Sequence, residues 1–531
     1  MRSRPVILTL AFLILSVVPL FESADKRTVE EGKYGGTLRV RSFAGGAFRS
    51  HFDPAGDAHD FLLEQVFDGL VRLDKDLNVV PVLADYWVIS EQGRKFTFYL
   101  RRGVRFHHGK ELEAEDVRAS LERLIDKRTE GTHFQYFLGK VAGAQEYREE
   151  KAAHVNGFRV LDKYTFEIAW THPHVSALYL LSAKFCKVLP ADLLASQGKG
   201  FFQKPSGTGP FKFAHWLRSP RLEIVGARLE RNAAYFGKRP FLDAVEFSPY
   251  YTLDHFLDRE VHIIPYFSSR LADTDCLVLE HESYSQAYLA MSCHLPPLDN
   301  QAVRRAIATA VDKKEIAKAA FRLDTIPQVT NNYIPAKLPG FFPADDKGGP
   351  DIKAAIEALN RNGYPGEGSF PAFSLYFEEP RIEEADKIYR ALKDSLEGLG
   401  IRLKMKSFRS VDEFRTSREP YLVFLNWRMD FPAPENVVFP LFLSSSVQNM
   451  GLMRYFNARL DELAARAETE ASWTERNALF QKIEQILEQD VPAIPLFSRQ
   501  ERLALQPYVR GVGIPPLGSF FLDAKEIWLD K

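Results

Sequence analysis

The sequence predicts an α/β protein built from several domains. Segments with the two-residue alternation of strands lie between segments with the three- and four-residue periodicity of helices along most of the chain. At roughly 100 to 200 residues per domain, 531 residues correspond to about three domain-sized units. Hydrophobic residues make up 45% of the chain and aromatic residues 13%, which is enough to build large cores.

The charge and cysteine content exclude two classes of protein. The 69 basic and 70 acidic side chains give a net charge of -1, so the excess of positive charge that holds a nucleic acid is missing. We expect no nucleic-acid partner. The three cysteines, Cys186, Cys276 and Cys293, are too few and too far apart for a disulfide scaffold or a CxxC zinc site, and at most one disulfide can form.

The N-terminus has the pattern of an export signal. Arg2 and Arg4 precede an apolar run over residues 6–21, which is shorter than the about 20 residues of a membrane-spanning helix. We assign residues 1–24 to a signal peptide. Glu22 would lie three residues before a cleavage site after Ala24, where a small residue is preferred, so an uncleaved membrane anchor is the alternative. No cysteine lies near the end of the run, which excludes a lipid-modified N-terminal cysteine.

The first half of the folded chain alternates strands with helices. Strand formers predominate in the predicted strands, as in Phe96 to Leu100, and Gly or Pro turns bound several of them. In the helices apolar residues recur every three or four positions, as Val117, Leu121 and Leu124 do. Strands are expected at 35–40, 95–101, 164–170, 211–213 and 245–247, and helices at 61–73 and 113–125.

The second half begins with a long predicted helix over 303–320, in which Val303, Ile307 and Ala310 share one face. A helix over 383–399 ends at Gly400, as a C-cap glycine would end it, and a strand over 401–405 follows. Residues 421–425 form a buried strand in this prediction. The last helix, 474–488, starts at a Thr474 cap and ends before Pro492.

Several segments, in this order and spacing, resemble the family 5 solute-binding proteins of ABC importers, whose best-known members carry dipeptides and oligopeptides. The resemblance covers most of the chain, and the ordered set is more specific than any one segment. The matching segments are Tyr34-Gly35-Gly36-Thr37-Leu38, Asp53-Pro54, Phe67-Asp68-Gly69-Leu70-Val71, 81–87, 96–109, 114–117, Gly207-Thr208-Gly209-Pro210-Phe211, Trp216, Asn232 with 235–238, Pro296-Pro297, 303–306, 427–432 and 492–497.

The resemblance implies a two-lobed α/β periplasmic-binding-protein clamshell of type II, with an extra domain on the first lobe. By this comparison 34–60, 187–272 and 496–531 form lobe I, 61–186 the extra domain and 273–495 lobe II. The chain departs from the family pattern at two places. Ala433 replaces a second acidic residue, and residues 259–263 replace a Gly-x-x-Asp-x stretch, so the loops near the ligand are expected to be specialised.

The ligand site implied by the resemblance centres on Asp430, because the matching acid of peptide binders pairs with the ligand's amino terminus. The alternatives are that Asp430 caps the turn before Pro432 or pairs with Arg428. Arg428 is the candidate for a ligand carboxylate, with solvent exposure or hinge pairing as its alternative.

Aromatic walls and a glycine-containing loop complete the predicted site. Trp427 and Phe431 would line it with broad apolar faces, unless they simply pack in a core. The loop with Phe43, Ala44 and Gly45 follows the first strand and would hydrogen-bond a ligand main chain, although an ordinary loop fits it equally.

We find no catalytic constellation and expect neither a cofactor nor a metal. The pairs His107-His108, His172-Pro173-His174 and Cys293-His294 lack the spacing of a zinc site or an HExxH helix. No nucleophile elbow, phosphate-binding loop or dinucleotide fingerprint is present.

Three functions remain open: a receptor that closes over a peptide-like ligand and delivers it to an ABC permease, a membrane-anchored ligand sensor, and an exported hydrolase. After peptides, the alternative ligands are chelated nickel, haem, and an opine- or sugar-like solute. A monomer outside the cytoplasm is the expected state.

Overall fold

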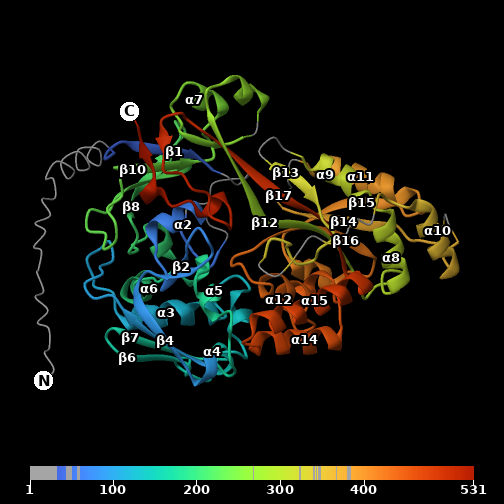
Figure 1. Cartoon of the computed structure of the whole chain (residues 1–531), viewed down its shortest axis with the longest axis horizontal. Coiled ribbons are helices and arrows are strands. Elements are labelled where there is room, and N and C mark those ends of the chain that lie inside the picture. Colours follow the sequence, from blue (N-terminus) through green and yellow to red (C-terminus); the bar gives the residue numbers. More distant parts are fainter. Residues whose placement is uncertain are drawn as a thin grey trace, which may run out of the picture.

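The structure, a computed structural model, describes residues 33–42, 51–56, 60–266, 268–321, 325–338, 341, 344, 348–365, 368–379 and 384–530. Two long strands, β12 (Leu277–Met291) and β17 (Ala493–Leu505), run from one half of the molecule to the other (Figure 1). They pair antiparallel along most of their length, with a register shift between Glu282 and Gln286. The two halves are therefore joined through one pair of strands.

The main sheet continues on both sides of this pair. Its strand order is β15-β14-β16-β12-β17-β11-β1-β10-β9-β8, with β13 added on β17. The strands of the first lobe are β1 (Thr37–Arg41), β8 (Phe211–Arg218), β9 (Ile224–Arg231), β10 (Ala244–Ser248) and β11 (Ile263–Pro265). Those of the second lobe are β13 (Thr325–Val329), β14 (Phe373–Glu378), β15 (Leu403–Phe408) and β16 (Tyr421–Arg428).

In the second lobe, helices cover both faces of the sheet. Leu289 and Met291 of β12 pack toward one helical layer and Tyr288 and Ala290 toward the other, as strand alternation requires. The first layer contains α8 (Gln301–Ala310), α9 (Lys313–Ala319), α10 (Ile352–Arg361) and α11 (Ala385–Glu397). The second contains α12 (Glu435–Phe442), α13 (Val447–Leu452), α14 (Ala458–Thr469) and α15 (Trp473–Asp490).

A smaller unit lies beside the first lobe. Its four-stranded antiparallel sheet has the order β4-β5-β7-β6, and α3 (Ala114–Ile125) packs against it. Its core also contains Phe431 and Ala433, which belong to the second lobe. Its other elements are β4 (Ala84–Ser90), β5 (Lys95–Leu100), α4 (Ala144–Arg148), β6 (Phe158–Asp162), β7 (Thr165–Ala169) and α5 (Ala177–Leu181).

Most predicted elements are present, but several of their boundaries differ, notably those of three helices. The helix expected over 61–73 is α2 (Asp60–Val66), followed by the short strand β2 (Val71–Leu73). The helix expected over 303–320 is two helices, because the Asp312 side chain accepts the backbone N–H groups of Lys314 and Glu315 and starts a new helix. The last helix begins at Trp473 with Ser472 as its cap, rather than at Thr474.

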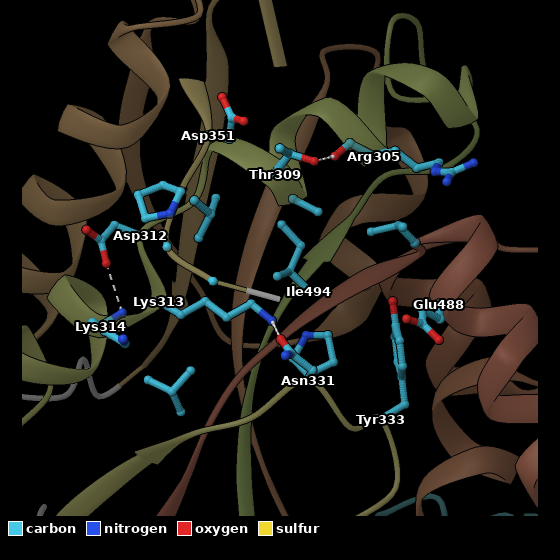
Figure 2. Close-up of a pocket in the computed structure, with 18 residues that line it drawn as sticks. Arg305, Thr309, Asp312, Lys313, Lys314, Asn331, Tyr333, Asp351, Glu488 and Ile494 are labelled. Atoms are coloured by element: carbon cyan, nitrogen blue, oxygen red, sulfur yellow. Dashed lines mark hydrogen bonds between the residues drawn. The ribbon is translucent and has the colours of Figure 1, made fainter. Parts of the chain in front are cut away.

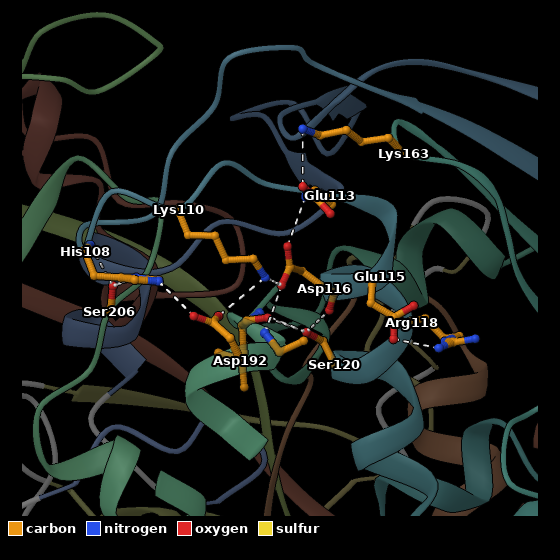
Figure 3. A network of polar contacts seen from close by, with 12 residues as sticks. His108, Lys110, Glu113, Glu115, Asp116, Arg118, Ser120, Lys163, Asp192 and Ser206 are labelled. Atoms are coloured by element: carbon orange, nitrogen blue, oxygen red, sulfur yellow. Dashed lines mark hydrogen bonds and ion pairs between the residues drawn. The ribbon is translucent and has the colours of Figure 1, made fainter. Parts of the chain in front are cut away.

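A polar network fixes the small unit to the first lobe (Figure 3). The ring of His108 lies 2.7 Å from the Ser206 hydroxyl, and the His107 Nε2 atom lies 3.0 Å from the Gly209 carbonyl oxygen. Lys110 pairs with Asp116 at 2.5 Å. Burial lowers the pKa of His107 to about 4, so this ring is neutral at physiological pH. His107 and His108 therefore hold two parts of the chain together.

Gly207 shows how tightly these parts fit. A Cβ atom there would overlap the carbonyl oxygen of Val66, whereas one at Gly200 would meet no atom within 4 Å. Overpacking against backbone typically costs 1–3 kcal/mol or more. We expect Gly207→Ala to lower the midpoint of thermal unfolding by several degrees and Gly200→Ala to leave it nearly unchanged. Differential scanning calorimetry measures both midpoints. Equal midpoints for the two variants would show that Gly207 does not pack tightly against Val66.

Candidate ligand-binding site

The predicted site lies where β16 leaves the sheet of the second lobe and approaches the first. The strand is buried from Tyr421 to Phe424, and its side chains become accessible at Asn426. Strand β16 extends three residues beyond the predicted 421–425, because Trp427 and Arg428 still pair with Gln286 and Ser285 of β12. The segment between β16 and α12 therefore starts at the junction of the two lobes.

Arg428 makes an ion pair across this junction. Its guanidinium lies 2.5 Å from the carboxylate of Asp60, the first residue of α2. Lys184 binds the other oxygen of Asp60 at 2.8 Å, and the Asp60 side chain is only 2% exposed. Burial opposes the charge of Arg428, but the carboxylates of Asp60, Asp430 and Glu501 outweigh it and raise its pKa. Arg428 thus already has an anionic partner within the chain.

Asp430 is placed differently. Its backbone N–H donates to the Asn436 side-chain oxygen at 3.0 Å, which fixes the segment on α12. Its carboxylate is half-buried and makes no hydrogen bond or ion pair with the part of the chain that the structure describes. Together with burial, which is the larger cause, its negative charge raises the pKa of the buried Tyr136 hydroxyl, so the two groups are neighbours. Its charge also helps to raise the pKa of Arg428, so a cation of the same segment lies close to it.

The two aromatic residues on either side of Asp430 pack into different cores. The Trp427 indole N–H donates to the Asn436 carbonyl oxygen at 2.9 Å, and its ring contacts the core of the second lobe. Phe431 is 2% exposed and meets Tyr136 edge to face at 5.6 Å, inside the core of the small unit. These packings anchor the segment between them at both ends. The predicted residues Phe43, Ala44 and Gly45 lie outside the described residues.

Sequence reasoning missed Asp60, Lys184 and Asn436 at this site. Each is a polar residue in a mostly apolar stretch, and each is at most 6% exposed. A charged residue inside an apolar run is rarely buried unless it is paired, and this was the available signal for Asp60 and Lys184. Nothing in the sequence indicated that Asp60 pairs with Arg428, which lies 368 residues away.

The other polar clusters singled out from the sequence have structural surroundings. All three cysteines are free, and the Cys293 thiol donates to the Met291 carbonyl oxygen. No group of three or more His, Cys, Asp or Glu side chains within the described ranges has the arrangement of a metal site. His172 and His174 lie within 3.5 Å of Glu468 on α14.

In the described part of the chain, every helix is too short or too polar to cross a membrane.

Comparison with known proteins decides the family. Residues 78–449 match the family model described as bacterial extracellular solute-binding proteins, family 5 Middle. The chain belongs to the family 5 solute-binding proteins. The resemblance found in the sequence is thereby confirmed. The α/β clamshell fold is confirmed by structural neighbours that are type II periplasmic binding proteins.

The relatives of this family 5 protein are distant but cover nearly all of it. Di/tripeptide-binding protein 1 of Pseudomonas aeruginosa is 24% identical over 88% of this chain and 91% of its own. Heme-binding protein A of Haemophilus influenzae is 24% identical over 96% of both chains. Among solved structures, the periplasmic binding protein DppA from Helicobacter pylori, in complex with the peptide STSA, superposes with a TM-score of 0.77 at 23% identity, over 95% of this chain and all of that one.

Proposed function

We propose that this protein is the exported receptor of an ABC importer, which captures a peptide-like ligand between its lobes and delivers it to a membrane permease. The observation that carries the proposal is the Asp430 carboxylate, half-buried at the junction of the lobes and without a hydrogen bond or ion pair among the described residues. The amino terminus of a peptide supplies the missing cation, and a charge-assisted hydrogen bond of this kind is strong when water is excluded.

The relatives support a peptide over other ligands. The name of the Pseudomonas relative specifies di- and tripeptides, and the Helicobacter structure contains a four-residue peptide. An extended peptide can add to exposed strand edges through its main chain, which leaves its side chains free in loose pockets. In this proposal Trp427 borders the pocket, Phe431 anchors the segment in the core of the extra domain, and the loop with Phe43, Ala44 and Gly45 contributes main-chain hydrogen bonds.

Arg428 has a different role in this proposal from the one its sequence position suggested. Because Asp60 already neutralises it, binding a ligand carboxylate would require Arg428 to leave a buried partner. We assign Arg428 to the contact between the lobes, and the carboxyl end of the ligand to another group.

The core clusters support the division into lobes expected from the sequence. One cluster draws on residues 38–67, 189–263 and 503–529, which matches lobe I except that residues 61–67 were expected in the extra domain. A second draws on 55–188 with Phe431 and Ala433, as the extra domain would. Two further clusters draw on residues 284–517, close to lobe II. We propose that the protein works as a monomer of these three units.

We further propose that the protein binds its solute without chemical change. The thiol nearest to the site, Cys186, is buried, and burial raises its pKa far above the usual range, so it is not a nucleophile at neutral pH. For export we propose residues 1–24 as a cleaved signal. The mass of the mature chain distinguishes this from the anchored sensor, which would keep those residues.

Haem and chelated nickel are the competing ligands, since one relative is named a heme-binding protein. Protein stripped of bound ligand by unfolding and refolding can be titrated in a calorimeter with Ala-Ala-Ala, hemin and a nickel chelate. The proposal predicts saturable heat with the peptide. Saturable binding of hemin or the nickel chelate, with none of a wider panel of di- to pentapeptides, would contradict it.

A further inference from the structure

The second lobe also contacts the extra domain beside the Asp430 segment, through helices α12, α14 and α15 (Figure 1). The extra domain is tied to the first lobe by the network around Asp116. Across the contact with the second lobe, in contrast, the described strands of the extra domain and of the second lobe do not pair. Side chains alone hold this contact, so it can separate without breaking a sheet.

Glu468 at the end of α14 is the centre of the contact. Lys140 of the extra domain binds it at 2.6 Å, and His172 and His174 of the same domain approach it to 3.5 Å. The Lys140 ammonium also lies over the Phe439 ring of α12, 4.4 Å from its centre. Glu468 is only 10% exposed, so a single carboxylate of the second lobe is enclosed by three basic side chains of the extra domain.

A second group of contacts lies next to the first. Ser176 of the extra domain donates to Glu435 at 2.9 Å and is bonded to Arg476 at 2.6 Å. Arg476 and Glu435 also pair with each other. Both charged side chains are at most 4% exposed, so this group excludes water from the junction.

His174 is the unusual member of the junction. It is 4% exposed, yet neither ring nitrogen has a hydrogen-bond partner. The ring contacts Trp170 at a tilt of 46° and borders a cavity of about 10 Å³ lined also by Tyr136, Glu435 and Phe439. A buried imidazole without hydrogen bonds is costly, and its protonated form is costlier still because Lys140 and Arg476 are close.

We propose that this junction is an acid-sensitive latch: its contacts stabilise the closed form of the receptor, and protonation of His174 opens it. The proposal rests on the proposed function only in that closure is the working motion of a two-lobed receptor. It makes the contact between the extra domain and the second lobe a determinant of ligand affinity.

The direction of the pH effect follows from the surroundings of His174. Burial is the largest cause and Lys140 the next, and despite the opposing charge of Glu468 they lower the pKa of His174 to about 3. In the open form the ring faces water, where a histidine has a pKa of about 6.5. The closed form is therefore fully stable above pH 6.5 and loses stability as the pH falls toward 3. Between pH 7.5 and 5.5 the ratio of closed to open molecules falls about tenfold.

The other charged groups that face His174 are Glu468 with Lys140 and His172, and Glu435 with Arg476. Burial would raise the pKa of Glu468, but the hydrogen bond from His172 and the charge of Lys140 outweigh burial and lower this pKa to about 2, so Glu468 stays ionised. The Glu435 carboxylate is neutralised by Arg476. His172 is one-third exposed and lies 3.5 Å from the Glu468 carboxylate. The measurements below are therefore made in a chain that carries His172→Asn, so that His174 is compared without this second histidine.

The experiment measures the distance between the lobes without any ligand. Spin labels are placed at Lys151→Cys beside α4 and Arg459→Cys on α14, both well exposed, in a chain with Cys276→Ser and Cys293→Ser. Pulsed electron paramagnetic resonance at pH 7.5 and 5.5 then gives the closed and open fractions. His174→Phe removes the titrating group and keeps a buried aromatic ring against Trp170. His215→Asn, on an exposed position of β8, is the control.

In the chain that carries His172→Asn, the latch predicts a tenfold fall of the closed-to-open ratio on acidification, the same fall when His215→Asn is added, and a constant ratio when His174→Phe is added. A constant ratio in the His172→Asn chain would overturn the proposal, as would a fall that persists when His174→Phe is added. So would the lack of any closed fraction at pH 7.5, because the junction would then not hold the lobes together. Since no ligand is present, none of these results depends on whether the protein binds peptides.

Discussion

Asp430→Asn should weaken the binding of a peptide with a free amino terminus by about 30-fold or more, and barely change the binding of its N-acetylated form. The substitution keeps the shape of the side chain and removes its charge. Removing one member of a buried, hydrogen-bonded charge pair typically costs 2–5 kcal/mol, and 2 kcal/mol corresponds to roughly 30-fold in affinity. Isothermal titration of the two peptides against each protein measures the difference.

The matched control for this experiment is Asp412→Asn. Asp412 is an exposed carboxylate of the second lobe that pairs with Arg415 on the surface, 64% and 62% exposed. Asp412→Asn should leave the affinities for the free and the acetylated peptide unchanged. If Asp430→Asn weakened the free and the acetylated peptide equally, the loss would come from a distorted site, and the pairing of Asp430 with an ammonium group would be wrong.

Arg476→Met is expected to be the most destabilising single substitution that we consider. Arg476 is 1% exposed and is the cation that neutralises the buried carboxylate of Glu435. Removal of one partner of a buried ion pair leaves an uncompensated charge and costs about 3–5 kcal/mol. The midpoint of thermal unfolding should fall markedly, whereas the double variant Arg476→Met with Glu435→Gln should recover part of the loss.

Arg459→Met provides the comparison on a nearby helix. Its partner Glu462 is 55% exposed, and surface pairs of this kind contribute about 0–1 kcal/mol. Calorimetry should therefore show little change for Arg459→Met. Similar midpoints for Arg459→Met and Arg476→Met would mean that water reaches Glu435, and that the contact around it is not closed.

The sequence was sufficient for those parts of the fold that follow from local patterns. Strand alternation gave β5 (Lys95–Leu100) and apolar periodicity gave α3 (Ala114–Ile125) within one residue or so. The helix over 303–320 was predicted as one because its apolar spacing continues through Val311, and the cap formed by Asp312 is a polar signal that periodicity alone overlooks. Strand β16 was predicted too short because its last residues are polar at the junction of the lobes.

The site could be predicted only in part for a related reason. The acid at Asp430 was found through the resemblance of its segment to a known family, and the structure places its carboxylate at the junction without a partner in the described chain. Arg428 is paired with Asp60, which Lys184 also binds, and both of these residues come from other segments of the chain. Pairings between residues hundreds of positions apart leave no trace in local sequence, and only the folded chain brings them together.

Native mass spectrometry tests most directly whether this protein carries short peptides. The protein would be produced with residues 1–24 in the gene, isolated from the export compartment, and weighed before and after mild unfolding. A peptide receptor should show a set of added masses that correspond to short peptides and disappear on unfolding. The mass of the chain itself should lack residues 1–24. A single added mass matching haem, a metal chelate or one non-peptide solute would contradict it.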